Sequence, residues 1–165
     1  MSAWEQSVGA TDEWYTPAYI FEALGEQFDL DVAGTWCGWN VPAKVRLTDR
    51  DDGLKYAPFW HGFVWMNPPF GGRNGLVPWL DAFFRHGDGV ALTPDRSSAP
   101  WWQVAARKSD ALLMIDGKVK FERPDGSVGK SPGTGTTLFA VGKRADQALR
   151  RAHECGLGLY MKALS

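Results

Sequence analysis

The sequence predicts an α/β protein in which helices cover both faces of an open, mostly parallel sheet. Short apolar runs alternate with amphipathic runs along most of the chain, a pattern typical of strands joined by crossover helices. Clusters of Gly, Pro, Asp and Ser separate these runs, as expected for turns. With 165 residues the chain is long enough for a domain with its own core. We expect a flexible lead at residues 1–12 and a single domain over residues 13–165.

Local patterns predict the first helix and the first strand. Thr16 followed by Pro17 is typical of a helix start, with threonine as the cap and proline at the first position, so we predict a helix over residues 18–24. Residues 28–32 alternate apolar and acidic side chains, which indicates a strand that ends at its last or second-last residue.

A long stretch after this strand lacks periodicity. Residues 34–61 are rich in Gly, Pro, Asp and Trp, and we interpret them as a long functional loop with a short helical turn at residues 51–54. The apolar residues 63–66 then predict a buried strand.

The second half of the chain continues the alternation. Strands are predicted over residues 89–92, 111–115 and 136–141, and helices over residues 77–84, 101–107 and 145–155. Ser97 or Ser98 is the expected cap of the middle helix, and the basic face of the last helix is expected to be solvated. The remaining expectations are a short strand at 119–121, a loop at 124–135, and a last strand or a frayed tail at 157–164.

The most informative segment is Asn67-Pro68-Pro69-Phe70, which follows the strand at 63–66. The prolines must end that strand, and they hold the Asn67 carboxamide and the Pro68 carbonyl rigidly at its carboxyl end. Phe70 adds a flat apolar face. Two oxygens held in fixed directions can accept hydrogen bonds from an exocyclic amino group, and a flat aromatic ring can stack on a planar base. The segment therefore suits a planar ring that carries an exocyclic amino group. The alternative interpretation is a plain turn between a strand and a helix.

Polar residues follow three of the predicted strands. Asp31, Asn67 and residues 93–96 each lie at the carboxyl end of a strand. In open parallel sheets ligands bind beyond these ends. We therefore expect the three positions to converge on one edge and to form one site.

Composition excludes several classes of protein. No apolar stretch is long enough to span a bilayer, and no signal peptide is indicated at the N-terminus. Cys37 and Cys155 match no metal spacing, nor do the three histidines, so no metal is expected. The net charge is −1, yet residues 1–60 carry −6 and residues 61–165 carry +5. The basic residues of the second half either face nucleic-acid phosphates or are ordinary solvated side chains. The nine tryptophans either fill the core or serve as stacking platforms for a base or a cofactor.

Five segments in order resemble the phage DNA N-6-adenine-methyltransferase (Dam) family, over a region from about Asp12 to Gly142. They are Glu13-Trp14-Tyr15-Thr16-Pro17, Leu30-Asp31-Val32-Ala33, Asn67-Pro68-Pro69-Phe70, Leu92-Thr93-Pro94 with Arg96, and Gly117-Lys118-Val119-Lys120-Phe121 with a closing strand.

The resemblance implies a compact Rossmann-like fold and a methyltransferase that depends on S-adenosylmethionine. The enzyme would methylate the exocyclic amino group of adenine in DNA, by direct transfer to a flipped-out base. Catalysis would rest on Asn67, Pro68, Pro69 and Phe70. The expected cofactor-binding residues are Trp14, Tyr15, Thr16, Pro17, Asp31, Ala33 and Asp52. The expected DNA-binding residues are Arg96, Lys118, Lys120, Phe121 and Arg123. DNA is the expected partner, without a membrane, and the expected location is the cytoplasm of a bacterial host, in phage DNA protection or restriction-modification.

The chain departs from larger amino-methyltransferases in three ways. No glycine-rich G-x-G turn follows the first predicted strand, which continues instead with residues 33–38. No clear strand that ends in an acid precedes Asn67, so Asp49, Asp51 and Asp52 are the available substitutes for holding the cofactor ribose. No separate target-recognition domain is evident.

The residue pattern leaves other functions open. The same Asn-Pro-Pro geometry serves any planar nitrogen, so the substrate could be RNA, cytosine or a protein amide. A non-enzymatic alternative is a compact DNA-binding module that has lost cofactor binding, which the degenerate first turn motivates. Arg96 suits a DNA phosphate, a site carboxylate or the plain surface. Lys118, Lys120 and Arg123 suit phosphates or an exposed hairpin face.

Overall fold

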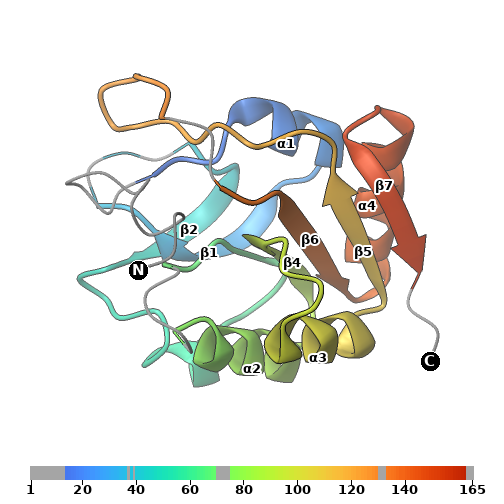
Figure 1. Ribbon diagram of the computed structural model, residues 1–165. Coiled ribbons are helices and arrows are strands. Elements are labelled where there is room, and N and C mark those ends of the chain that lie inside the picture. The colour runs from blue at the N-terminus through green and yellow to red at the C-terminus, as the bar shows by residue number, and fades with distance from the viewer. Residues whose placement is uncertain (1–13, 37, 39, 70–74, 130–132, 163–165) are drawn as a thin grey trace.

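The computed structural model describes residues 14–36, 38, 40–69, 75–129 and 133–162. In this part of the chain a seven-stranded sheet carries four helices (Figure 1). The strands are β1 (Phe28–Gly34), β2 (Ala43–Thr48), β3 (Val64–Met66), β4 (Gly89–Pro94), β5 (Ala111–Ile115), β6 (Thr136–Val141) and β7 (Gly158–Lys162). The helices are α1 (Ala18–Leu24), α2 (Val77–His86), α3 (Pro100–Lys108) and α4 (Lys143–Glu154), with a 3-10 turn η1 at Ala57–Phe59.

The sheet is parallel in one half and antiparallel in the other. Its strand order is β2-β1-β3-β4-β6-β5-β7. The first four strands pair in parallel, whereas the β4–β6, β6–β5 and β5–β7 ladders are antiparallel. The expectation of a mostly parallel sheet therefore holds for one half only. Two successive reversals return β5 to the direction of β4, so β1 to β5 all end at the same side of the sheet, which we call the carboxyl edge.

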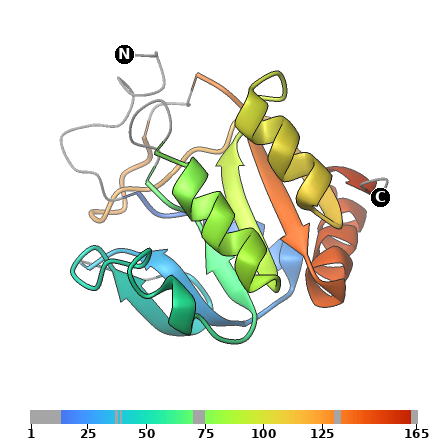
Figure 2. The ribbon, with the colours of Figure 1, turned by 90° about the horizontal axis from the view of Figure 1, so that it is seen from below.

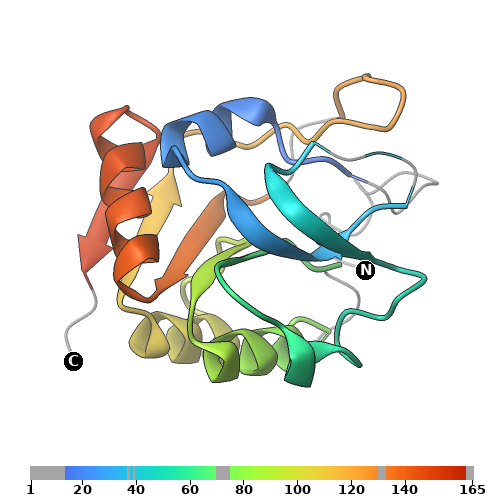
Figure 3. The same ribbon diagram turned by 180° about the vertical axis from the view of Figure 1, so that it is seen from behind.

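The helices cover both faces of the sheet, as the sequence predicted. Helices α1 and α4 contact each other on one face, and α2 and α3 lie side by side across the other (Figures 2 and 3). The strand before Asn67 feeds both cores, because Phe63 and Trp65 join the α1–α4 side while Val64 and Met66 join the α2–α3 side. Strands buried on both faces are continuously apolar, which explains the uninterrupted runs in the sequence.

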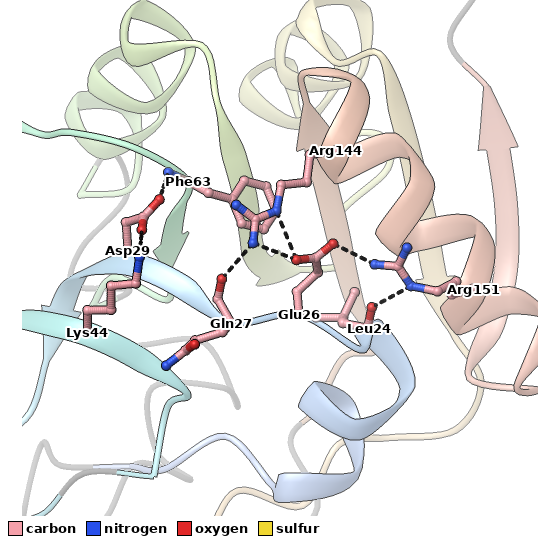
Figure 4. A network of polar contacts seen from close by, with 8 residues as sticks. All are labelled: Leu24, Glu26, Gln27, Asp29, Lys44, Phe63, Arg144 and Arg151. Atoms are coloured by element: carbon pink, nitrogen blue, oxygen red, sulfur yellow. Dashed lines mark hydrogen bonds and ion pairs between the residues drawn. The ribbon is translucent and has the colours of Figure 1, made fainter.

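An ion-pair network ties α1 to α4 (Figure 4). The two carboxylate oxygens of Glu26 accept hydrogen bonds from Arg144 Nε at 2.9 Å and from Arg151 Nη2 at 2.6 Å. Both arginines also donate to backbone carbonyls, of Gln27 at 2.9 Å and of Leu24 at 3.1 Å. The basic face of the last helix is therefore not simply solvated. It fixes the chain at the point where α1 leads into β1.

Residues 34–61 are not the long loop that their composition suggested. They contain β2, which pairs in parallel with β1 at the edge of the sheet. Only Ala43 and Thr48 of β2 are buried, because an edge strand has one neighbour and tolerates polar side chains. The expected helical turn at 51–54 is a series of hydrogen-bonded turns, and η1 follows it.

Several local predictions were wrong in detail. β1 continues to Gly34, and residues 119–121 form no strand, since in the described hairpin only isolated bridges occur, at Glu122. Ala99, not a serine, precedes α3 as its cap residue. Pro17 occupies the cap position of α1, and the Thr16 hydroxyl makes no cap bond within the described residues.

Residues 157–164 do contain a strand, β7. The predicted flexible lead at 1–12 lies outside the described residues.

Candidate active site

A pocket at the carboxyl edge collects residues from three distant parts of the chain. It lies between the segment before α1, the end of β1 with the loop that follows, and the end of β3. Its lining residues are Trp14, Tyr15, Thr16, Asp31, Ala33, Gly34, Thr35, Gly38, Asn40, Val41, Trp65 and Asn67. The pocket therefore contains five of the seven residues that the sequence suggested for a cofactor, together with Asn67 of the suggested catalytic motif.

Asn67 directly follows β3, where Pro68 and Pro69 prevent the strand from continuing. Its side chain is half-buried, and Pro68 is buried behind it. Asn67 Nδ2 donates a hydrogen bond to Thr16 Oγ1 at 3.1 Å. The carboxamide is therefore tied at its nitrogen end. Phe70, the proposed stacking face, lies outside the described residues.

Asp31 contributes a nearly buried carboxylate, with 2% of its surface exposed. β1 lies between β2 and β3, and Asp31 pairs with Arg46 on one side and with Trp65 on the other. Its Oδ1 accepts a hydrogen bond from the Ala33 N–H at 3.3 Å. A Cβ atom at position 34 would lie 2.9 Å from Asp31 Oδ2. Gly34 thus allows close backbone approach to the carboxylate even though the turn lacks a G-x-G pattern.

The segment before α1 is fixed to the hairpin at 118–128. Tyr15 donates its backbone N–H to the Glu122 carbonyl at 2.8 Å, and Glu122 returns a bond to the Tyr15 carbonyl at 3.0 Å. The Trp14 ring packs on Gly129, where a Cβ atom would overlap it, and the Arg123 guanidinium lies 5.1 Å from the centre of the ring. The expected cofactor segment and the expected DNA hairpin are therefore neighbours.

Two buried donors in the pocket are unsatisfied. The Trp14 indole N–H and the Tyr15 hydroxyl have no hydrogen-bond partner in the described part of the chain. A buried donor without a partner is costly, and such groups commonly belong to a binding site. Gly38 packs on the Tyr15 hydroxyl so closely that a Cβ atom there would overlap it. Two residues with unsatisfied donors thus line the same pocket as Asp31.

Pro17 and Asp52 do not line the pocket. Pro17 is buried at the start of α1. Asp52 is exposed, has a φ of 57°, and accepts a bond from the Lys55 N–H at 3.3 Å. The structure also corrects the view that no strand leading to an acid precedes Asn67, because β2 ends immediately before Asp49.

Asp51, the second of the three acids after β2, is hydrogen-bonded within its own turn. The Asp51 carboxylate accepts bonds from the backbone N–H and the hydroxyl of Thr48, at 2.8 and 2.9 Å. These bonds favour the ionised form and lower the pKa of Asp51. Asp51 thus closes the turn after β2.

The proposed DNA-binding residues lie along the segment between β5 and β6, except for Arg96, which follows β4. Lys118, Lys120 and Arg96 are exposed. Phe121 is half-buried and packs against the α1–α4 core. Arg123 lies over Trp14, as described above. None of these residues lines the pocket, and Arg123 contacts it through Trp14.

Sequence patterns missed half of the lining residues. Gly34, Thr35, Gly38, Asn40, Val41 and Trp65 were not among the expected site residues. Asn40 donates from Nδ2 to the Thr16 carbonyl at 2.6 Å. Trp65 was predicted only as a core residue, and its place opposite Asp31 follows from strand register. Strand pairing was the only signal that could have located it.

Two features are absent from the described residues. They contain no group of three or more His, Cys, Asp or Glu side chains arranged to hold a metal. None of the helices in this part of the chain has the length and apolar character that crossing a membrane requires.

Comparison with known proteins identifies a family. The family model described as DNA N-6-adenine-methyltransferase (Dam) matches residues 5–148, which is most of the 165-residue chain. No curated protein and no solved structure gives a match. The matched region includes the whole pocket, Asn67 and the hairpin at 118–128. The chain therefore belongs to the DNA N-6-adenine-methyltransferase (Dam) family, whose members are DNA adenine methyltransferases.

Proposed function

We propose that this enzyme uses S-adenosylmethionine to methylate N6 of an adenine that has been flipped out of DNA. The observation that carries the proposal is the position of Asn67. It lies at the rim of the pocket that holds Asp31 and two unsatisfied donors. A methyl donor in the pocket and a base at the Asn67 side would then be adjacent.

The residues of the pocket fit the amino-acid end of S-adenosylmethionine. The Asp31 carboxylate would hold the ammonium group through a charge-assisted hydrogen bond. The Trp14 indole N–H and the Tyr15 hydroxyl would donate to the carboxylate, which would satisfy the two donors that lack partners. Asp49, at the end of β2, is better placed by the topology for the ribose hydroxyls than Asp52 is. When bound, the cofactor supplies a methyl group on a positively charged sulfur.

Asn67 and Pro68 would act on the nucleophile. The amino lone pair of adenine is delocalised into the ring, so the nitrogen is a poor nucleophile. Hydrogen bonds from the amino group to Asn67 Oδ1 and to the Pro68 carbonyl would draw the nitrogen toward a tetrahedral geometry and stabilise the positive charge that develops on it. The protein thus contributes positioning and electrostatics. As the new N–C bond forms, the bond between the methyl group and the sulfonium sulfur would break, and the nitrogen would then release its extra proton to water.

The DNA would lie across the carboxyl edge. An adenine in a duplex cannot reach Asn67, so the base must leave the stack, with Phe70 and Phe121 as candidate stacking faces. Lys118, Lys120 and Arg123 belong to the connection between β5 and β6, and Arg96 follows β4, so all four leave the sheet at this edge and would contact phosphates. Recognition of a particular DNA site would rest on these loops.

The test is transfer of labelled methyl groups from S-adenosylmethionine to unmethylated DNA, followed by digestion to nucleosides. Label in N6-methyladenine supports the proposal. Label absent from DNA, in spite of cofactor binding measured by calorimetry, would move the substrate to RNA or protein. Absence of cofactor binding would refute the proposal.

Asn67→Ala should lower the rate of methyl transfer by about 10²-fold or more while the protein remains folded. Gln147→Ala is the matched control, because it removes a carboxamide from the exposed face of α4. Full activity of Asn67→Ala would remove Asn67 from the mechanism.

A further inference from the structure

We propose that Thr16 is a positioning residue that holds the Asn67 carboxamide in the place where its oxygen end can face the substrate. This inference rests on the proposed function and gives Thr16 a task other than cofactor binding. It starts from the hydrogen bond that Asn67 Nδ2 donates to Thr16 Oγ1, at 3.1 Å.

The orientation of the carboxamide matters because its two ends have nearly the same shape and opposite chemistry. Only the oxygen end accepts a hydrogen bond from an adenine amino group. A hydroxyl can donate as well as accept, so the bond to Thr16 fixes where the carboxamide lies, and in the observed orientation the nitrogen end is bound to Thr16 and the oxygen end is turned away from it. A reversed amide would present an N–H to the substrate's amino group, so two donors would face each other.

The Thr16 hydroxyl is available for this task. In the described residues α1 receives no side-chain cap bond, although Thr16-Pro17 has the sequence of a helix cap. Thr16 is only 2% exposed, so water does not compete for its hydroxyl. A β-branched side chain also has few rotamers, which limits where the hydroxyl can go.

The backbone around Thr16 is fixed on three sides. The preceding residue, Tyr15, exchanges two backbone bonds with Glu122. The Thr16 carbonyl accepts a bond from Asn40 Nδ2 at 2.6 Å. The following residue, Pro17, has a restricted φ and leads into α1. Thr16 thus links the pocket wall to the end of β3.

Thr16→Val removes the hydroxyl and keeps the shape, whereas Thr16→Ser keeps the hydroxyl. Thr136→Val is the matched control, because Thr136 is also 2% exposed and its hydroxyl has no partner in the described structure. With both substrates saturating, Thr16→Val should lower the single-turnover rate of methyl transfer about 10- to 100-fold. Thr16→Ser should restore most of it. The dissociation constant for S-adenosylmethionine, measured by calorimetry, should change less than about threefold in both.

A second readout does not depend on activity. The side-chain amide resonances of Asn67, identified by their absence in Asn67→Ala, should shift and lose exchange protection in Thr16→Val but not in Thr136→Val. Unchanged resonances would overturn the proposal. So would a wild-type rate at saturation, and so would a rate defect that comes only from weakened cofactor binding. If the wild-type protein transfers no methyl group at all, the proposed function fails, whereas the resonances still decide whether Thr16 orients Asn67.

Discussion

Tyr15 and Glu122 exchange two backbone hydrogen bonds, at 2.8 and 3.0 Å, although they lie far apart in the sequence. The bridge joins the wall of the pocket to the basic hairpin between β5 and β6. Because backbone groups make both bonds, side-chain substitutions at these positions leave the bridge in place. The cofactor and DNA surfaces of the proposed site are therefore mechanically connected.

Gly38→Ala should weaken the binding of S-adenosylmethionine about tenfold or more. The new Cβ atom would overlap the Tyr15 hydroxyl, and the rigid ring must move to relieve the overlap. Isothermal calorimetry measures the effect. Gly135→Ala is the control, because its Cβ atom would meet only Asp95, at an ordinary distance of 3.6 Å. Equal affinities for the two variants would show that Tyr15 does not hold the cofactor.

Replacing Lys118 and Lys120 together by alanine should weaken DNA binding and its dependence on salt. Each lysine that contacts a phosphate contributes about 0.9 to the slope of the logarithm of the binding constant against the logarithm of salt concentration. Fluorescence anisotropy over a salt series should therefore give a slope smaller by about 2. The Lys108→Ala/Lys143→Ala variant removes the same charge from the opposite side of the sheet and should bind DNA normally. The same loss in both variants would contradict a hairpin contact.

Asp29 and Asp88 should have opposite effects on stability as pH changes. Hydrogen bonds from the Lys44 ammonium and the Phe63 N–H lower the pKa of Asp29 below its ordinary value of 3.8. Its contribution to stability is therefore present at neutral pH and lost as pH falls through the lowered pKa. Burial raises the pKa of Asp88, against opposing effects of His86 and Arg144. Its contribution is present in acid and lost as pH rises through the raised pKa.

Urea unfolding from pH 7 to about pH 3 measures both carboxyl groups. Asp29→Asn should be less stable than wild type at pH 7, and this difference should shrink as pH falls below 3.8. Asp88→Asn should be more stable than wild type at pH 7, and its difference should vanish in acid. Changes of the same sign at neutral pH would contradict the assignment.

Glu26→Gln should lower the free energy of unfolding by about 1–3 kcal/mol, because two arginines lose a carboxylate that is largely buried. The Glu26 side chain is 12% exposed, whereas both arginines are partly solvated. Glu22→Gln, on the exposed face of α1, should change stability by less than about 0.5 kcal/mol. Equal values for the two variants in urea unfolding would mean that the network in Figure 4 adds little to stability.

The sequence predicted the interior strands well because burial on both faces makes them continuously apolar. Residues 89–92 and 111–115 are such runs, and both proved to be strands. β2 could not be found in this way. It is an edge strand that carries Lys44 and Arg46, and its hydrogen bonds to β1 depend on tertiary pairing. Missing β2 also hid the position of Asp49.

In the candidate site, strand ends were predictable and cross-chain contacts were not. The rule that polar residues gather beyond parallel strands brought Asp31 and Asn67 together in advance, and both line one pocket. The same rule pointed to Arg96, which the pocket does not include. Asn40 gave no signal because its partner is a backbone carbonyl, and every residue has one.

The antiparallel pairing of β5 with β6 has a consequence for how members of this family can diversify. The chain leaves the sheet after Ile115 and re-enters it at Thr136, both at the carboxyl edge, and the described residues of this connection, 116–129 and 133–135, include a stretch that passes beside α1 (Figure 1). A connection that starts and ends on the same side can lengthen without displacing any strand, and doubling its length costs only about 0.6 kcal/mol. Insertions at its tip, at residues 124–126, would leave the Tyr15–Glu122 bridge in place and enlarge the surface that the proposed function offers to DNA, so this tip is the natural place to graft a new target preference.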